Sequence, residues 1–450
     1  MENVVKHIVI NKLYDIYDYD IPFDRGGVAL ITGPNGFGKT TLLEIIKNAL
    51  SVNFWYFYDL LFQSIVIYLG DGTRLDFNKT MSSNGVREVA YSDDEVHATF
   101  SFSDDIPNEV IITHCDKNSK ILSQALLDPD KFFELLKYSP RLYNLAHNKV
   151  VQTNSTFSFE LTKEDLAFLS EKDFKGQFME LRMFSQEHDC LSIQAQRIFK
   201  KQKGLISDNN SVQNEYVISQ LADNVKLMYQ KQNNIYAERS QQIDSTFVQR
   251  LIDNSHEPYS KEVYQEKIAV LKSKIASLEK YGLVEKNYKL VEDYRDDLIG
   301  TLSLQIDDLA SKFSVYDDFY SKLECFDKFV SGKGFYNKRM ILDSKYGITF
   351  MSENGRVIAP QLLSSGEQNL VILYYRLVFE TNNNTLLLVD EPENSMHVEW
   401  LQKMLPDYLE MESTLGCQMI IATHSPTFIN GHWDIAYDLY GGSYQDWLES

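Results

Sequence analysis

The sequence predicts an α/β protein whose main sheet is assembled from both ends of the chain, with a helical segment inserted between them. Near the N-terminus, an apolar strand at residues 28–32 leads into a glycine-rich turn and a helical stretch that begins at Lys39. Near the C-terminus, two more apolar strands, at 385–389 and 419–422, alternate with helical stretches. Long apolar strands that alternate with helices are typical of a sheet covered on both faces.

Residues 1–200 are expected to form the first lobe. Apolar and polar residues alternate before the first apolar strand, as in β structure. The same alternation recurs from about 54 to 102 between turn-like Gly, Asp and Asn residues, which favours further strands. Residues 104–185 are mixed and become more helical towards their end, and a short strand at 190–193 closes the lobe.

The middle of the chain, 201–333, is expected to be a helical insertion, because residues 214–329 contain one Pro and two Gly. Two stretches repeat apolar residues every three and four positions, the pattern of a coiled-coil seam. The first seam comprises Tyr264, Ile268, Leu271, Ile275 and Leu278, and the second Leu298, Leu302, Ile306, Leu309, Phe313, Tyr316, Tyr320 and Leu323. Because Gly282 separates them, the seams predict an antiparallel coiled-coil hairpin. Each seam is short, so an ordinary helical bundle is the alternative.

Residues 334–450 are expected to form the second lobe. After a strand near 347–351, a helix begins at Glu367, and the two apolar strands are separated by a helix from about His397. Both lobes then contribute strands to the same sheet.

The composition of the chain argues against several classes of protein. The net charge of −20 argues against an extensive nucleic-acid-binding surface, because affinity for nucleic acid depends mainly on clustered Lys and Arg. Basic clusters around Lys200 and Lys338 are interpreted as solvated faces. No apolar run reaches the roughly 18 residues of a membrane helix, the N-terminus does not resemble a signal peptide, and the four cysteines form no CxxC pair. We therefore expect a cytoplasmic protein with protein partners.

Residues 33–40, GPNGFGKT, match the pattern GxxxxGK[ST] of a phosphate-binding loop. Its glycines allow backbone N–H groups to surround phosphate oxygens, and the following helix points the positive end of its dipole at them. Lys39 would neutralise the β- and γ-phosphates, and the Thr40 hydroxyl would ligate Mg²⁺. The residues expected to bind ATP here are Gly33, Asn35, Gly36, Gly38, Lys39, Thr40 and Thr41.

Two carboxylates, Asp390 and Glu391, follow the apolar strand 385–389. Asp390 is placed to hold Mg²⁺ through water, and Glu391 to polarise the water that attacks the γ-phosphate. Together with the phosphate-binding loop, these acids predict ATP hydrolysis. A third acid, Glu393, either helps to position the metal or a neighbouring subunit, or caps the next helix.

Residues 363–368, LSSGEQ, place small residues at the start of a helix, where a Ser hydroxyl and the helix N-terminus suit a γ-phosphate. With the motifs above, this segment resembles the LSGGQ signature of ABC-type ATPases, with Ser365 in place of one Gly. The chain is thus similar to ABC/SMC-type P-loop ATPase heads, in which the signature of one subunit closes on the nucleotide of another. The resemblance implies a composite site across a head-to-head dimer, with Ser364, Gly366 and Glu367 contacting the nucleotide.

Two further residues complete the site that the resemblance implies. His424 follows the strand 419–422 and resembles the switch histidine that contacts the γ-phosphate. In the stretch SIQAQR, both Gln194 and Gln196 are candidates for the glutamine that reaches ATP and Mg²⁺, and we favour Gln196. The implied catalytic residues are Lys39, Glu391 and His424, and the implied metal ligands are Thr40, Asp390 and Gln196.

The spacing and the residues of the motifs limit which ATPase families the chain resembles. The phosphate-binding loop and the signature lie 331 positions apart (364 − 33), whereas transporter ATPases place their signature much sooner. LSSGEQ, DEPENSMH and ATHSP resemble the stand-alone ATPases of bacterial anti-phage systems and the heads of OLD-type nucleases. Because the chain ends 26 residues after His424 (450 − 424), we expect no fused Toprim nuclease.

Among these families, the chain most resembles the AriA ATPases of the PARIS defence system, which hold a Toprim nuclease toxin, AriB, until a phage protein triggers its release. The PtuA ATPases of Septu, which work with an HNH nuclease, are next. Both resemblances imply a ring-like homo-oligomer built from dimers, a separate nuclease effector, a phage-encoded trigger and no membrane partner.

Two alternatives stay open. A RecF/SMC-like DNA-repair ATPase would clamp DNA directly, but the acidic balance and the short seams count against it. A nucleotide-gated scaffold without turnover conflicts with the presence of Glu391.

Overall fold

A computed structural model of the protein divides into two compact units. It describes residues 4–23, 26–79, 90–92, 95–99, 110–127, 160–161, 178–187, 189–194, 199–200, 215–253, 257–382, 384–394 and 396–443. The first unit comprises Met1–Ala195, Thr381–Asn394 and Leu401–Ser450, and the second Gln196–Glu380 and Ser395–Trp400. The three stretches expected from the sequence (1–200, 201–333 and 334–450) stay a prediction. Within the described ranges, no helix is both long and apolar enough to cross a bilayer.

One sheet of the first unit comes from the N-terminal part of the chain. It is antiparallel, in the order β2-β1-β4-β5-β8-β9. Its strands are β1 (Val5–Leu13), β2 (Tyr17–Pro22), β4 (Ser64–Leu69), β5 (Arg74–Lys79), β8 (Val110–Cys115) and β9 (Ile121–Leu127). Alternate side chains such as Ile8, Ile65 and Phe77 are fully buried, as expected for a sheet with one face on a core. The β structure predicted from alternation is confirmed in β1, β2, β4 and β5, whereas β8 and β9 lie in the segment 104–185 that was expected to be mixed.

The other large sheet joins both ends of the chain, as the sequence predicts. Its order is β11-β17-β18-β3-β19-β20, and all neighbours are parallel except β19 and β20. The strands are β3 (Val28–Thr32), β11 (Cys190–Gln194), β17 (Leu386–Asp390), β18 (Gln418–Ala422), β19 (Ala436–Asp438) and β20 (Gly442–Ser443). In register, Leu388 lies beside Ile420, and Ile420 beside Ala29, so strands far apart in sequence align their C-terminal ends. Functional residues that follow these strands therefore meet at one edge.

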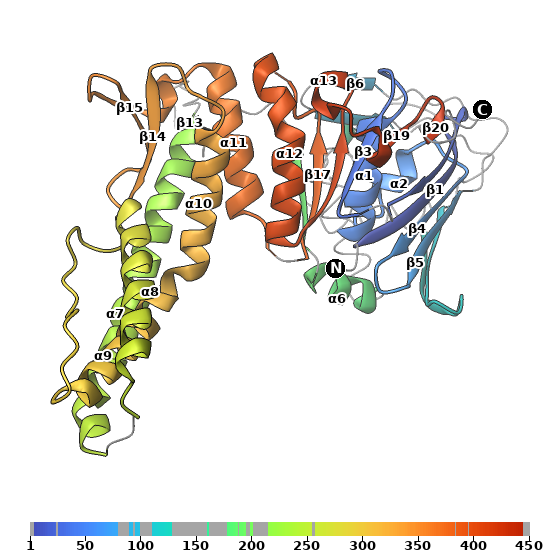
Figure 1. The fold of residues 1–450 in the computed structure, drawn as a ribbon. Coiled ribbons are helices and arrows are strands. Elements are labelled where there is room, and N and C mark those ends of the chain that lie inside the picture. The colour runs from blue at the N-terminus through green and yellow to red at the C-terminus, as the bar shows by residue number, and fades with distance from the viewer. Residues whose placement is uncertain are drawn as a thin grey trace, which may run out of the picture. The chain divides into compact units, whose positions relative to one another are not determined.

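Helix α1 (Lys39–Leu50) packs between the two sheets of this unit (Figure 1). One core cluster contains Leu42 and Ile46 of α1, Ile8 of the first sheet, and Leu388 and Ile420 of the second. Among the described residues of this unit, the other helices are α2 (Tyr56–Asp59), α6 (Met179–Glu187), α13 (Pro426–Ile429), η3 (Trp433–Ile435) and the part of α12 (Val398–Leu415) from Leu401 onwards. A small sheet contains β6 (Ala90–Ser92), β7 (Glu95–Thr99) and β10 (Glu160–Leu161). The core fixes the start of α1 relative to the strand ends.

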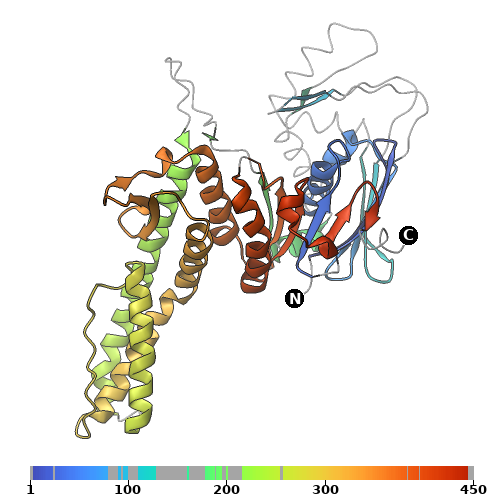
Figure 2. The same cartoon turned by 45° about the horizontal axis from the view of Figure 1, so that its top comes forward.

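The second unit is mainly helical. Its helices are α7 (Val217–Ile252), α8 (Lys261–Lys280), α9 (Ile299–Phe313), η1 (Ser314–Tyr316), α10 (Asp317–Ser331), η2 (Pro360–Leu362) and α11 (Ser365–Phe379). Its strands are β12 (Phe199–Lys200), β13 (Glu215–Tyr216), β14 (Lys338–Asp343), β15 (Gly347–Ser352) and β16 (Val357–Ile358). Figure 2 shows α7 to α9 running side by side as an arm, and α11 packs on α10 and α7. The predicted helical insertion is confirmed.

The pairing of the two apolar seams differs from the expected antiparallel hairpin. Lys267 Nζ lies 2.9 Å from Asp307 Oδ1, and Lys280 Nζ lies 2.9 Å from Asp327 Oδ2, so α8 runs parallel to α9 and α10. The antiparallel neighbour of α9 is α7, where Lys312 Nζ lies 2.6 Å from Asp244 Oδ1.

The connection after α8 explains the difference. Residues 281–298 return along the arm without forming a helix (Figure 1). Eighteen extended residues (298 − 280) reach roughly 60 Å, and α8, with 20 residues, spans only about 30 Å. Periodicity identifies a buried stripe but not its direction, and the arm is the helical bundle left open as the alternative.

Candidate nucleotide site

The turn between β3 and α1 has the backbone geometry of a phosphate-binding loop. Gly33 has φ 144° and Gly38, the residue before α1, has φ 81°. Residues with a Cβ rarely adopt these backbone angles. A Cβ on Gly33 would also lie 3.3 Å from Leu439 Cβ. Asn35 and Gly36 form the tip of the turn. The loop therefore presents its backbone, followed at once by a helix N-terminus.

Lys39 folds back over this loop. Its side chain is buried, and Nζ donates hydrogen bonds to Gly33 O at 2.8 Å and to Pro34 O at 3.2 Å. The next two residues anchor the loop elsewhere. Thr41 Oγ1 lies 2.6 Å from the Tyr14 hydroxyl, and Thr40 Oγ1 donates to Asp390 Oδ2 at 2.9 Å. The first turn of α1 is thus tied both to the turn that follows β1 and to the end of β17.

Asp390 is half-buried, and one of its two carboxylate oxygens is bonded to Thr40. Its Oδ1 is buried and has no hydrogen-bond partner among the described residues. Burial raises the pKa of Asp390 to about 6; the charges of Glu391 and Glu393 add to the rise, whereas the Thr40 hydrogen bond and Lys39 oppose it. A free oxygen on a carboxylate of raised pKa is suited to a cation, whose charge would favour the ionised form.

Glu391 follows Asp390 in a strained conformation. Its φ is 46°, unusual for a residue with a side chain, and its N–H donates to Ala422 O at 2.9 Å. The carboxylate is held from both sides. Oε2 accepts from Asn394 Nδ2 at 2.8 Å, and Oε1 lies 3.5 Å from His424 Nδ1. The backbone bond continues the pairing of β17 with β18, and the carboxylate lies beside the histidine predicted from the sequence.

Glu393 is buried and holds the end of β18. Its Oε1 accepts from Thr423 Oγ1 at 2.7 Å and from the His424 backbone N–H at 3.0 Å, and lies 3.2 Å from His424 Nδ1. These bonds go to the two residues that follow β18, and within the described part of the chain none goes to the start of α12, so the capping interpretation is wrong. Asp390, Glu391 and His424 meet at this edge of the sheet with Lys39 and Thr40.

The signature segment belongs to the second unit. Ser364 caps α11: its Oγ accepts from the Glu367 N–H at 3.4 Å, while Glu367 Oε2 accepts from the Ser364 N–H at 2.9 Å. Ser364 and Ser365 are exposed, Gly366 is half-buried, and Glu367 is buried.

Lys338 at the start of β14 pairs with this carboxylate, with Nζ 2.9 Å from Glu367 Oε1 and 3.0 Å from Oε2. Burial acts to raise the pKa of Glu367, but the bonds from Lys338 and Ser364 outweigh it and lower that pKa. Glu367 is therefore held as an anion at the start of the helix.

The glutamine favoured from the sequence cannot be placed. Gln196 lies outside the described residues. Gln194 is the last residue of β11, and its Cα is in register with that of Asp390 on the neighbouring strand. Gln194, the other candidate, therefore lies at the same edge of the sheet as Asp390, the predicted metal ligand.

Aromatic side chains support the phosphate-binding loop, although no sequence motif predicts them. The Tyr19 hydroxyl donates to Phe37 O at 2.6 Å. The Phe37 ring lies 5.1 Å from that of Tyr17 and 5.6 Å from that of Tyr440, measured between centroids. The alternating tyrosines of β2 are a visible signal, but their side of the strand could not be assigned without the sheet.

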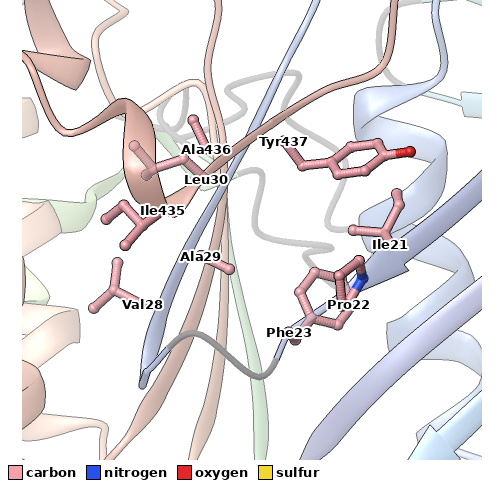
Figure 3. A pocket seen from close by; sticks show the side chains of 9 residues that line it. All are labelled: Ile21, Pro22, Phe23, Val28, Ala29, Leu30, Ile435, Ala436 and Tyr437. Carbon is pink, nitrogen blue, oxygen red and sulfur yellow. The ribbon is translucent and has the colours of Figure 1, made fainter. Parts of the chain in front are cut away.

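An apolar pocket lies next to β3, the strand that leads into the loop (Figure 3). Its lining residues are Ile21, Pro22, Phe23, Val28, Ala29, Leu30, Ile435, Ala436 and Tyr437. Tyr437 supplies the single side-chain polar atom of this lining. The pocket therefore lacks the charged groups that a triphosphate requires and is distinct from the site above.

Comparison with known protein families decides the class. A family model described as an AAA ATPase domain matches residues 8–429. The chain belongs to this AAA ATPase family. Its predicted fold class, an α/β P-loop ATPase head with a helical insertion, is confirmed. A comparison with curated proteins found no match.

Solved structures similar to this AAA ATPase include three head domains of SMC proteins. The SMC head domain from Thermotoga maritima has 12% identity and a TM-score of 0.32, covering 97% of this chain and 94% of that one. An SMC head bound to the C-terminal winged-helix domain of ScpA has 11% identity and a TM-score of 0.34, with coverage of 95% and 91%. An SMC head with an extended coiled coil, bound to the C-terminal domain of ScpA and derived from Pyrococcus furiosus, has 12% identity and a TM-score of 0.32, with coverage of 95% and 91%.

Proposed function

We propose that this AAA ATPase hydrolyses ATP at a composite site formed by two copies of the chain. One copy supplies the phosphate-binding loop, Asp390, Glu391 and His424, and the other supplies the signature around Ser364. The hydrogen bond from Thr40 to Asp390 supports hydrolysis most directly, because it joins the loop and the acid that Mg²⁺-dependent hydrolysis requires at one point.

The side chains at this point fit a magnesium-bound triphosphate. Thr40 supplies a hydroxyl oxygen, and Asp390 supplies a buried oxygen without a hydrogen-bond partner among the described residues. Oxygen ligands from one or two protein groups are typical of Mg²⁺ beside nucleotide phosphates. When bound, the ion would offset negative charge on the phosphates and on Asp390. Lys39, held by the loop's own carbonyls, would exchange those bonds for phosphate oxygens.

Glu391 and His424 are the residues to which we assign the chemistry. Glu391 accepts a proton from the attacking water as that water adds to the γ-phosphorus, and the bond to the β-phosphate oxygen breaks. Asn394 holds one carboxylate oxygen and leaves the other beside His424. The His424 side chain is 46% exposed, so its ring is accessible to a γ-phosphate.

The signature is the reason for proposing a second copy. Ser364 and Ser365 are exposed at the N-terminus of α11, a helix of 15 residues. Exposed N–H groups and the helix dipole at such a terminus favour a phosphate. Within one chain, this segment belongs to a different compact unit from the phosphate-binding loop. The motif resemblance supplies the partner, because ABC/SMC-type signatures act on the nucleotide of another subunit.

Ser364→Arg tests the composite site. The bulky cation should block closure on the partner, so steady-state phosphate release should be lost. ATP binding by the single chain should stay within about twofold, because the binding residues lie in the other unit. Ser331→Arg, at an exposed serine that ends α10, is the matched control and should keep its turnover. Normal turnover by Ser364→Arg would contradict the proposal.

We further propose that the ATPase is the sensor and regulator of an anti-phage system, controlling a separate nuclease of the Toprim class, with an HNH nuclease as the next choice. The motifs LSSGEQ, DEPENSMH and ATHSP support this role through resemblance. Co-purification of a nuclease encoded by the adjacent gene, released when a phage protein is added, tests it. Tight, salt-dependent binding of duplex DNA by the isolated ATPase would instead favour the DNA-repair alternative.

A further inference from the structure

The signature carries a buried negative charge next to the position proposed for a partner's triphosphate. Glu367 is 9% exposed, and its Oε2 accepts from both the N–H and the hydroxyl of Ser364, each at 2.9 Å. In the ABC signature that this segment resembles, the matching position is a neutral glutamine. A carboxylate held here repels the γ-phosphate that Ser364 is proposed to meet.

Lys338 lies within bonding distance of both oxygens of this carboxylate, at 2.9 Å and 3.0 Å. The pair is largely shielded from water, because the side chains are 20% exposed for Lys338 and 11% for Glu367. In such surroundings a nearby opposite charge acts strongly. The lowered pKa of Glu367, despite its burial, agrees with an ion pair that stays charged.

We propose that Lys338 is a positioning residue that cancels the charge of Glu367 and thereby allows the signature to close on a partner's ATP. The inference rests on the composite site proposed above. Lys338 acts through Glu367 and Ser364 and has no assigned contact with the nucleotide. Lys338 is the first residue of β14, seven positions after α10 ends at Ser331 (338 − 331).

Lys338→Met removes the cation and keeps the length of the side chain. We expect turnover to fall at least tenfold while the ATP affinity of the single chain stays within about twofold. Lys338→Arg should restore most of the rate, because it keeps the charge. Arg339→Met is the matched control: its Nη2 contacts Met351 Sδ at 3.7 Å, so its loss should leave the rate near that of the wild type.

The decisive variant combines Lys338→Met with Glu367→Gln. Both charges are then absent, and we expect turnover to recover to at least a third of the wild-type rate. A defect caused only by the lost bulk of Lys338 would persist in this double variant.

Two results would overturn the inference: wild-type turnover by Lys338→Met, or a double variant as inactive as Lys338→Met alone. Failure of the composite site itself would give a different result. In that case Ser364→Arg would keep its turnover, whatever the Lys338 variants do. Retained ATP binding by every variant shows that the chain has folded.

Discussion

The hydroxyl of Thr40 donates a 2.9 Å hydrogen bond to the carboxylate of Asp390, although the two residues are 350 positions apart. Thr40 lies in the first turn of α1 and Asp390 at the end of β17, with β18 separating β17 from β3 in the sheet. The bond joins the N-terminal and C-terminal parts of the first unit at the phosphate-binding loop. The proposed chemistry depends on this junction, and the predictions below test its parts.

Asp390→Asn should stabilise the nucleotide-free protein at neutral pH. The folded pKa of Asp390 lies at about 6, above its ordinary 3.8. Below pH 3.8 the carboxyl group is neutral in both states. As the pH rises through 6, the folded protein must bury a charged carboxylate, and the stability present at low pH is lost. The shift corresponds to roughly 3 kcal/mol at most. We expect the unfolding free energy of the variant to exceed that of the wild type above pH 6 and to match it near pH 4. Urea unfolding at several pH values measures this difference. A constant difference would contradict the burial argument.

Lys39→Ala should weaken ATP binding at least about tenfold, because a charge-assisted bond contributes roughly 1.5–3 kcal/mol. Titration with a fluorescent ATP analogue measures the change. Lys47→Ala is the control, since Lys47 lies on the same helix and pairs with Glu44. Equal affinities for the two variants would remove Lys39 from the site.

Glu391→Gln should slow hydrolysis by at least ~100-fold, the lower end for the loss of a general base, while ATP stays bound. Single-turnover phosphate release and filter retention of labelled ATP measure the two effects. Glu399→Gln changes a carboxylate on α12 whose side chain is 85% exposed, and it should behave as the wild type. Unchanged release by Glu391→Gln would exclude its assigned role.

Glu393→Met should lower turnover by on the order of 10- to 100-fold, the range seen when a group that orients a metal-ligating histidine through a hydrogen bond is removed. The variant removes the acceptor shared by Thr423, the His424 backbone and His424 Nδ1. Glu393→Gln keeps an acceptor oxygen and should be less affected. Comparing kcat and KM for ATP checks the prediction, and a defect confined to KM would argue against it.

The fold of the head could be predicted largely from local sequence. Apolar runs such as 386–389 are fully buried in the sheet, so their composition alone identifies them as strands. The loop at Gly33 to Thr40 follows a pattern that a single local mechanism explains. These features need no knowledge of distant contacts.

Features that depend on tertiary pairing were not accessible in the same way. The seam of α8 was found, but the extended connection at 281–298 reversed the direction expected from Gly282. The bonds of Glu393 to Thr423 and His424 join residues 30 and 31 positions apart, and no local pattern announces them. The pairing of Lys338 with Glu367 was missed for the same reason.

A mixing experiment tests the composite site most directly. Lys39→Ala lacks a functional loop but keeps its signature, and Ser364→Arg has the reverse defect, so each should be inactive alone. Equal mixing should create dimers with one intact site and restore phosphate release to about a quarter of the wild-type rate, if half the dimers are mixed and one of their two sites works. Phosphate release that stays at the level of the separate variants, or full turnover by Ser364→Arg alone, would contradict a site shared between two copies.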